Sequence, residues 1–328
     1  MACHKAAVAA RAVSMTSLPT ARTAAVASLL RWFDGAAGVP VADDPRADRI
    51  DMLRALPFAA LHLGCVGIVW TGVSATALAV AIALYLVRMF AITGFYHRYF
   101  SHRTFRTSRA VQFVFAVLGA SCVQRGPLWW AAHHRHHHAN ADSPRDLHSP
   151  RVHGFWRSHV GWFLTRRAFA TDLARVPDLA RFPELRWLDR FDVAVPLALM
   201  ALLYGVGALL ARVAPGLGTS GSQLVVWGFF VSTVALFHVT VTINSLAHRF
   251  GSRRFETRDD SRNNPLLALV TLGEGWHNNH HFFPGTARQG FYWWEIDLTW
   301  YGLELLAALG LVHDVKRVPA WVHAKARA

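Results

Sequence analysis

Histidine is the residue type whose placement in this chain points most directly to chemistry. The chain has 328 residues and 19 histidines. Most of them fall in three clusters: HRYFSH at 97–102, HHRHHH at 133–138 and HNNHH at 277–281. A fourth element, NSLAH at 244–248, adds a histidine and an asparagine. Many neutral imidazoles without cysteine suit a borderline transition metal such as iron or zinc, so the clusters predict a metal site.

The spacing within the clusters decides which imidazoles can converge. An α-helix turns by about 100° per residue, so positions i, i+3 and i+4 lie within an arc of about 100°. His277, His280 and His281 have this spacing. Asn244 and His248 are an i, i+4 pair and share one helix face. These residues are therefore candidate ligands.

The stretch HHRHHH meets the same spacing rule in two registers. His134, His137 and His138 form one set, whereas His133, His136 and His137 form the other. Both sets place three imidazoles on one face of a helix. Spacing alone leaves both registers open.

The pair His97 and His102 does not fit an ideal α-helix. Five residues separate the two positions, which puts them about 140° apart. They would need a frayed helix end, or two separate metals, to act as ligands together. One metal takes four to six ligands, so eight or more convergent histidines predict two metals. Two irons in a histidine-rich shell are suited to O₂ activation and attack on an unactivated C–H bond.

Long apolar runs predict that these clusters sit on a membrane protein. Hydrophobic residues make up 53% of the chain and charged residues 16%. Residues 55–87 contain no charged side chain. One helix of that length would be about 50 Å long, against about 30 Å of hydrocarbon, so two spans joined around residues 71–74 fit better. Four spans are expected, at about 55–73, 75–96, 191–211 and 223–246.

The distribution of Lys and Arg predicts the orientation of the spans. Residues 88–190 contain 16 of these cations and the segment after 246 contains 10, whereas the connection 212–222 contains 1. By the positive-inside rule, both termini and the central segment lie in the cytoplasm. The expected fold is an all-α integral membrane protein of two hairpins, whose cytoplasmic helical cap, 97–190 and 247–315, holds the dimetal centre. A buried helical core of a soluble protein would explain neither the span lengths nor this charge asymmetry.

Three regions along the chain are expected. Residues 1–50 are Ala- and Arg-rich and form a weakly ordered leader, or the true start is Met15. Residues 51–315 form the membrane domain, and 316–328 form a tail.

Two further apolar stretches are expected to be interfacial or cap-buried helices rather than spans. They cover residues 110–123 and 290–312. The first is too short to span the hydrocarbon. The second carries Glu295, Asp297 and Glu304, which argue against a fifth span.

HRYFSH, HRHHH, NSLAH and GEGWHNNHHFFP, in this order, resemble the integral-membrane fatty-acyl desaturases, specifically the acyl-CoA Δ9 (stearoyl-CoA desaturase-like) branch. The resemblance covers about residues 55–315. The family pattern W-A-x-x-H-R-x-H-H lies over Trp130 to His138, which implies the register of His134, His137 and His138. It implies a nine-histidine dimetal shell with Asn244 reaching a metal through water. The nine are His97, His102, His134, His137, His138, His248, His277, His280 and His281.

The resemblance also implies a substrate tunnel. Gln124, Trp130 and Thr240 match positions that fix a bend in the acyl chain beside the metals, which implies a cis product at Δ9. Other histidines lie in family segments or stand alone and are expected not to be ligands. These are His62, His148, His153, His159, His238, His313 and His323.

The implied reaction is O₂-dependent desaturation of a saturated acyl thioester, acyl-CoA, at two Fe²⁺ ions. The sequence contains no HPGG haem motif, so electrons are expected from ferredoxin or a similar small acidic carrier with its reductase. The net charge of +14 suits such a carrier, and equally suits lipid headgroups or CoA.

Three functions other than desaturation are less well supported by the sequence. A membrane diiron hydroxylase or alkane-type monooxygenase would return oxygen to carbon, but NSLAH with GEGWHNNHH favours the desaturase. A histidine-rich metal transporter or storage protein would need polar residues inside its spans, and the first three spans have almost none. Nucleic-acid binding is not expected, since the basic residues surround the spans and no nucleic-acid motif is present.

Overall fold

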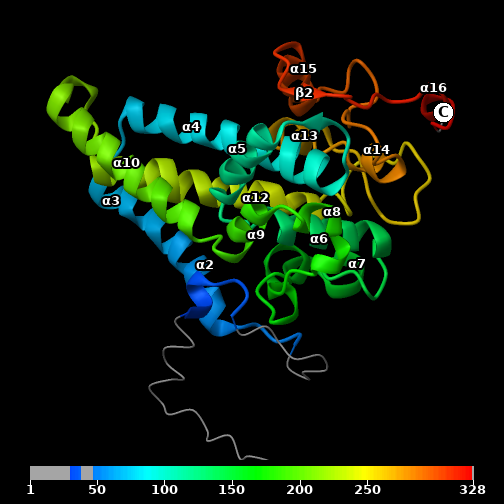
Figure 1. Cartoon of the computed structure of the whole chain (residues 1–328), viewed down its shortest axis with the longest axis horizontal. Coiled ribbons are helices and arrows are strands. Elements are labelled where there is room, and N and C mark those ends of the chain that lie inside the picture. The colour runs from blue at the N-terminus through cyan, green and yellow to red at the C-terminus, as the bar shows by residue number, and fades with distance from the viewer. Residues whose placement is uncertain (1–29, 38–46, 327–328) are drawn as a thin grey trace, which may run out of the picture.

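The computed structural model describes residues 30–37 and 47–326. Two hairpins of long helices extend from one side of a helical cap (Figure 1). The described residues contain one small sheet, in which β1 (Arg106–Thr107) pairs antiparallel with β2 (Val312–His313). The fold is therefore built from helices, as the sequence predicts.

The first hairpin begins with a helical segment over Met52–Thr71. Gly72 ends it with φ of +61°, a left-handed conformation that costs glycine little. Ser74 then caps the next helix, since its hydroxyl accepts a hydrogen bond from the Ala77 amide. The pieces of this hairpin are α2 (Met52–Gly64), η1 (Cys65–Gly67), α3 (Ile68–Thr71), α4 (Ala75–Phe90) and the π-helix η2 (Ala91–Ser101).

The second hairpin packs closely against itself. Its first arm is α10 (Ala194–Val213), and its second arm is one helical segment over Gly221–Ser245. The pieces of the turn and second arm are η6 (Pro215–Leu217), α11 (Gly221–Leu224), the π-helix η7 (Val225–Val231) and α12 (Ser232–Ser245).

Polar contacts tie the tips of the two hairpins together. The Gln223 amide oxygen accepts from Ser74 Oγ at 2.7 Å, and its nitrogen donates to the Thr71 carbonyl at 2.8 Å. Trp227 Nε1 donates to the Gly72 carbonyl at 2.8 Å. The Thr71 and Gly72 carbonyls of the first turn are thus bonded by the second hairpin.

The prediction of four spans is confirmed as four helices long and apolar enough to cross a membrane. They contain 20, 27, 20 and 25 residues, and their ends fall within five residues of the predicted ends. The second runs on to Ser101 because the helix continues as a π-helix instead of ending near residue 96. The side of the membrane on which the cap lies stays a prediction.

The cap consists of short helices around the inner ends of the spans. Helices α5 (Arg109–Ala120) and α15 (Leu298–Ala308) lie in the two apolar stretches and both contact η2. Residues 290–297 form a loop instead of a helix, because the buried carboxylates of Glu295 and Asp297 accept hydrogen bonds from backbone amides. The other cap helices are α6 (Pro127–Asn140), α7 (Pro150–His153), η3 (Arg157–Gly161), η4 (Arg167–Phe169), η5 (Leu173–Arg175), α8 (Pro177–Ala180), α9 (Pro183–Arg190), α13 (Pro265–Val270), α14 (His277–Phe282) and α16 (Ala320–His323).

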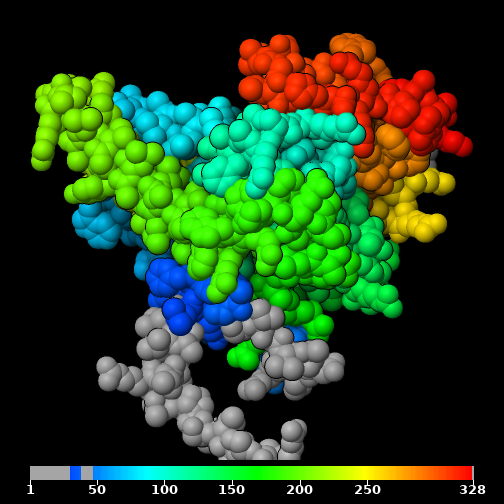
Figure 2. Space-filling model, viewed as in Figure 1, coloured from blue at the N-terminus to red at the C-terminus, as the bar shows by residue number. Residues whose placement is uncertain are grey.

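The two ends of the described chain pack against the cap. Trp32 Nε1 donates to the Leu53 carbonyl at 2.9 Å, and Asp34 pairs with Arg190 at 2.7 Å. Val322 is fully buried beside Phe255, and the C-terminal segment covers one corner of the surface (Figure 2). The predicted leader and the possible start at Met15 fall largely on residues 1–29 and 38–46, outside the described residues.

Gly207 provides a test of how closely the arms of the second hairpin pack. A Cβ at Gly207 would lie 2.4 Å from the Ser220 carbonyl oxygen, whereas a Cβ at Gly205 meets nothing within 4 Å. We expect Gly207→Ala to destabilise the fold by about 1–3 kcal/mol through overpacking. Gly205→Ala on the same helix is the control. Thermal unfolding in detergent measures the difference, and equal melting temperatures for the two variants would contradict this packing.

Candidate metal centre and acyl tunnel

The nine predicted histidines lie together as two adjacent groups. Within each group the candidate ligand atoms are all within 4.8 Å of one another. The first group has five members: His97, His102, His134, His138 and His280. The second has four: His137, His248, His277 and His281.

A π-helix brings His97 and His102 into the same group. The His102 amide hydrogen-bonds the His97 carbonyl at 3.3 Å, an i to i+5 contact typical of π-turns. The wider turn places residues five apart on one face, and the ring centroids are 5.0 Å apart. Because of this π-turn, His97 and His102 need neither a frayed helix end nor two separate metals to act together.

Helix α6 serves both groups. His134 and His138 belong to the first group, and His137 to the second. His133 and His136 turn away, since their Nε2 atoms contact the carbonyls of Ala168 and Arg145. The alternative register therefore has no convergent set, and the register implied by the resemblance is the one that converges.

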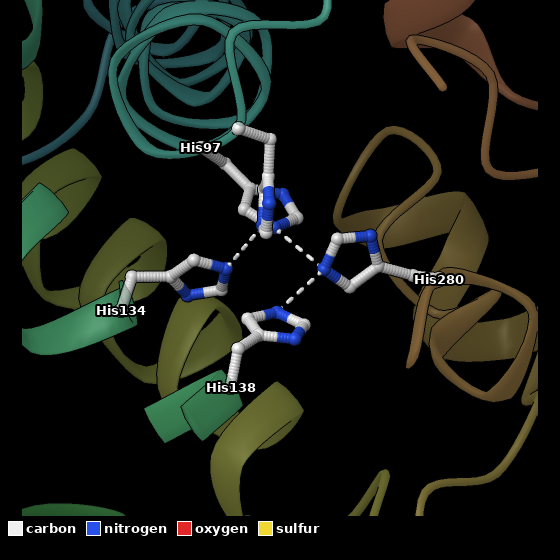
Figure 3. Close-up of side chains that lie close together, drawn as sticks. His97, His134, His138 and His280 are labelled. Atoms are coloured by element: carbon white, nitrogen blue, oxygen red, sulfur yellow. Dashed lines mark hydrogen bonds between the residues drawn. The ribbon is translucent and has the colours of Figure 1, made fainter. Parts of the chain in front are cut away.

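Helix α14 repeats this division at the opposite wall. His280 faces the first group, while His277 and His281 face the second. Figure 3 shows His280 pointing at His97 and His138 across the space between the cap elements. The Nε2 atoms approach closely, at 3.1 Å for His97 and His280 and 2.9 Å for His280 and His138.

Four carboxylates lie behind four of the nine histidines and orient the Nε2 atoms of those rings. A carboxylate only accepts, so each facing imidazole carries its hydrogen on Nδ1 and leaves the Nε2 lone pair free. The contacts join Asp142 to His248 at 2.8 Å, Asp146 to His137 at 2.9 Å, Asp259 to His281 at 2.9 Å, and Glu274 to His97. Sequence reasoning did not single out these acids. For Asp142, Asp146 and Glu274 the available signal was that each lies within eight residues of a histidine cluster, whereas Asp259 had no such signal.

The protonation states favour a bound cation. Burial, reinforced by neighbouring histidines, holds the pKa of His134, His138 and His280 well below the usual value, so these rings are neutral. Burial alone would raise the pKa of Asp259, but the hydrogen bond from His281 holds it well below its usual range. Among the described residues, the buried Nε2 atom of His281 has no hydrogen-bond partner. Neutral imidazole nitrogens are the commonest metal ligands in proteins, and here they converge in two groups, so these donors fit two metal ions.

An apolar cavity leads to the two groups. It has a volume of about 240 Å³ and is lined by aromatic and aliphatic side chains together with Gln124, Trp130, Thr240 and Asn244. A smaller cavity of about 50 Å³ continues from it past Met89. Trp130, His134, Thr240 and Asn244 line both cavities, so the acyl path would pass directly beside the metals.

The three predicted tunnel residues meet at this junction. Gln124 Nε2 donates to Thr240 Oγ1 at 3.1 Å. The Trp130 ring stacks on His134, with centroids 5.1 Å apart. The structure brings all three beside the first metal group, and Asn244 lines the junction at the second cavity as well.

Histidines that the sequence analysis set aside have partners of their own. His62 Nε2 lies 2.9 Å from His238 Nε2, and His238 Nδ1 lies 3.1 Å from His159 Nε2. This chain of imidazoles links α2, α12 and η3 outside the two metal groups. The His148 ring lies against that of His137 in a tilted arrangement, with centroids 4.4 Å apart, and His153 Nε2 lies 2.8 Å from the Asp146 carbonyl.

Comparison with known proteins identifies the family. The sequence pattern of the family described as "Fatty acid desaturase" matches residues 73–314. The chain belongs to this family. Family membership makes it an oxidoreductase of fatty acyl chains, and the four candidate spans and the two histidine groups are consistent with a membrane-bound, metal-binding member.

Desaturases related to this one differ in carrier and in the position of the double bond. It is 37% identical to "Acyl-CoA 5-desaturase AL21" of Anemone leveillei over 83% of this chain and 81% of the relative. It is 35% identical to "sn-1 stearoyl-lipid 9-desaturase" of Anabaena variabilis, over 82% of this chain and 94% of the relative. It is 36% identical to "Delta-9 acyl-lipid desaturase 1" of Arabidopsis thaliana, over 82% of this chain and 84% of the relative.

The adjacent acids Asp259 and Asp260 allow a matched test of this desaturase's carboxylate–histidine contacts. Asp259 holds His281, whereas the ion pairs of Asp260 with described residues are those with Arg151 and Arg253. We expect Asp259→Asn to weaken metal retention by about 10- to 100-fold, because the amide no longer fixes the His281 tautomer. Metal analysis after dialysis against a chelator measures this. Asp260→Asn should behave as wild type, and equal retention by both variants would contradict the assignment.

Proposed function

We propose that this desaturase introduces a cis double bond at Δ9 of a saturated fatty acyl chain, carried as a thioester of CoA. The observation that carries the proposal is the pair of convergent histidine groups beside an apolar cavity. In a chain of the desaturase family, this arrangement is suited to oxidising an unactivated hydrocarbon held next to two metals.

The two histidine groups are proposed to hold two Fe²⁺ ions, with Asn244 assisting through water. When bound, the irons with O₂ supply the oxidant that removes hydrogen from two adjacent methylenes. Four electrons reduce O₂ to two waters: two come from the acyl chain and two from an external donor, together with two protons. The cavity walls exclude water and hold one C–C bond beside the metals, which is a positioning effect. Trp130 and the Gln124–Thr240 pair fix the chain at that point.

A cluster of arginines at one end of the cavity supports an anionic carrier. Arg31, Arg54 and Arg125 line this end. Their nearby acids are Asp51 and Asp192, so the cluster has one cation in excess. Within the described part of the chain, the buried Nε atoms of Arg31 and Arg54 have no hydrogen-bond partner. Unpaired guanidinium donors suit phosphate oxygens, as in the CoA part of an acyl-CoA.

The same cluster would also accept a phospholipid headgroup, and the relatives include acyl-CoA and acyl-lipid enzymes. Purified, iron-loaded protein offered stearoyl-CoA or a distearoyl phospholipid separates the two carriers. Conversion of the phospholipid alone would move the proposal to an acyl-lipid substrate.

The proposed function also includes the orientation in the membrane and the source of electrons. The enzyme is proposed to be a multi-pass membrane protein, with its termini and metal centre on the cytoplasmic side. Electrons are proposed to come from ferredoxin or a similar small carrier with its reductase.

Matched histidine variants on α6 test the reaction. His138 faces the first metal group, whereas His136 contacts the Arg145 carbonyl. We expect host cells expressing wild type or His136→Ala to accumulate a new cis-monoenoic acid, and His138→Ala cells to lack it. Gas chromatography–mass spectrometry with double-bond localisation gives the answer. A hydroxy acid in place of the alkene would show a hydroxylase, and activity of His138→Ala would reject the ligand role.

A second test concerns the position of the double bond. Thr240→Val keeps the side-chain shape but removes the oxygen that accepts from Gln124. Loss of this hydrogen bond, worth about 0.5–1.5 kcal/mol, should lower conversion by about two- to tenfold. Neighbouring positional isomers should appear in the same product analysis. An unchanged single isomer formed at the wild-type rate would show that this pair does not position the chain.

A further inference from the structure

A polar hollow opens on the cap directly over the two histidine groups. It has a volume of about 690 Å³. His138 of the first group and His281 of the second both line it. As whole residues both are half-buried, although the His281 side chain itself is only 1% exposed, whereas His280, His277 and His248 are buried. The hollow thus adjoins one candidate ligand residue of each metal group.

The hollow lies away from the acyl path. The two apolar cavities share four lining residues with each other, and the hollow shares none with either. Along α6, Trp130 and His134 face the apolar cavities, and His138, one turn further, faces the hollow. The metal groups therefore separate an apolar side that would hold substrate from a polar side that is open to water.

The rim of the hollow carries two unpaired cations. Arg145 and Arg258 are exposed, and neither guanidinium has an ion pair or hydrogen bond to any described residue. The rim also holds two acids. Glu256 interacts with another residue, and Asp259 is buried against His281. Two free arginines over a metal site attract an acidic partner and raise its association rate.

We propose that this hollow is the docking and electron-entry surface for a small acidic redox protein. The proposal rests on the proposed function, in which each turnover takes two electrons from outside the chain. Two reduced one-electron carriers, O₂ and two protons convert –CH₂–CH₂– to –CH=CH– and two waters, leaving two oxidised carriers. Electron transfer slows steeply with distance. Since His138 and His281 line the hollow, a donor bound there would lie beside a candidate ligand of each metal group.

Charge reversal at the rim tests the proposal. The variant Arg145→Glu/Arg258→Glu should raise the KM for an acidic [2Fe–2S] ferredoxin by about tenfold or more and weaken its salt dependence. Product formed in a single turnover after reduction by dithionite should equal that of wild type. Arg186→Glu is the matched control, since Arg186 is exposed on α9 and does not line the hollow.

Direct binding gives an answer that does not depend on activity. Calorimetric titration with the same ferredoxin should show about tenfold or greater loss of affinity in the double variant, and no loss in Arg186→Glu. Unchanged affinity and KM in the double variant would overturn the docking surface. If wild type reduced by dithionite forms no alkene, the proposed function fails instead, and the binding result still decides the docking surface.

Discussion

The arrangement of the cap depends on one electrostatic constraint: nine imidazole rings direct their ligand atoms into two small buried spaces. Within the first of these spaces, the Nε2 atom of His280 lies only 2.9–3.1 Å from those of His138 and His97, a convergence that suits a shared cation. Carboxylates on the far side of the rings orient them by contacting the Nδ1 atoms of His97, His137, His248 and His281. Since the chain has only 20 acidic residues, committing four of them to these contacts shows how closely the cap is built around the site.

Backbone geometry distributes the ligands between the two groups. Helix α6 and helix α14 each give residues to both groups, which fixes the spacing between the two metal positions. The π-helix η2 has a different role, because its wider turn aligns His97 and His102 on one group. A span that ended as a regular α-helix would direct one of these rings away.

The same geometry separates two chemical environments. Trp130, Thr240 and Asn244 meet the metal groups from the apolar side, where water would compete with oxidation of a hydrocarbon. His138 and His281 meet them from the polar side. An oxidase that takes a lipid chain and electrons at one centre needs both approaches. The proposed separation lets the two partners bind without competing.

The sequence by itself determined the four spans and the convergence of His277, His280 and His281, because apolar length and i, i+3, i+4 spacing are local properties that need no knowledge of the fold. The family resemblance, rather than spacing, implied the full set of nine histidines and the register on α6. Only the tertiary structure decided how the histidines divide into five and four, since His138 and His280 are 142 residues apart. The four supporting acids were also beyond sequence reasoning, because an Asp in a loop acquires its role only when folding brings a ring nitrogen to it. The π-turn at His97 belongs to the same class, since π-helices are rare and the spacing of apolar residues does not predict one.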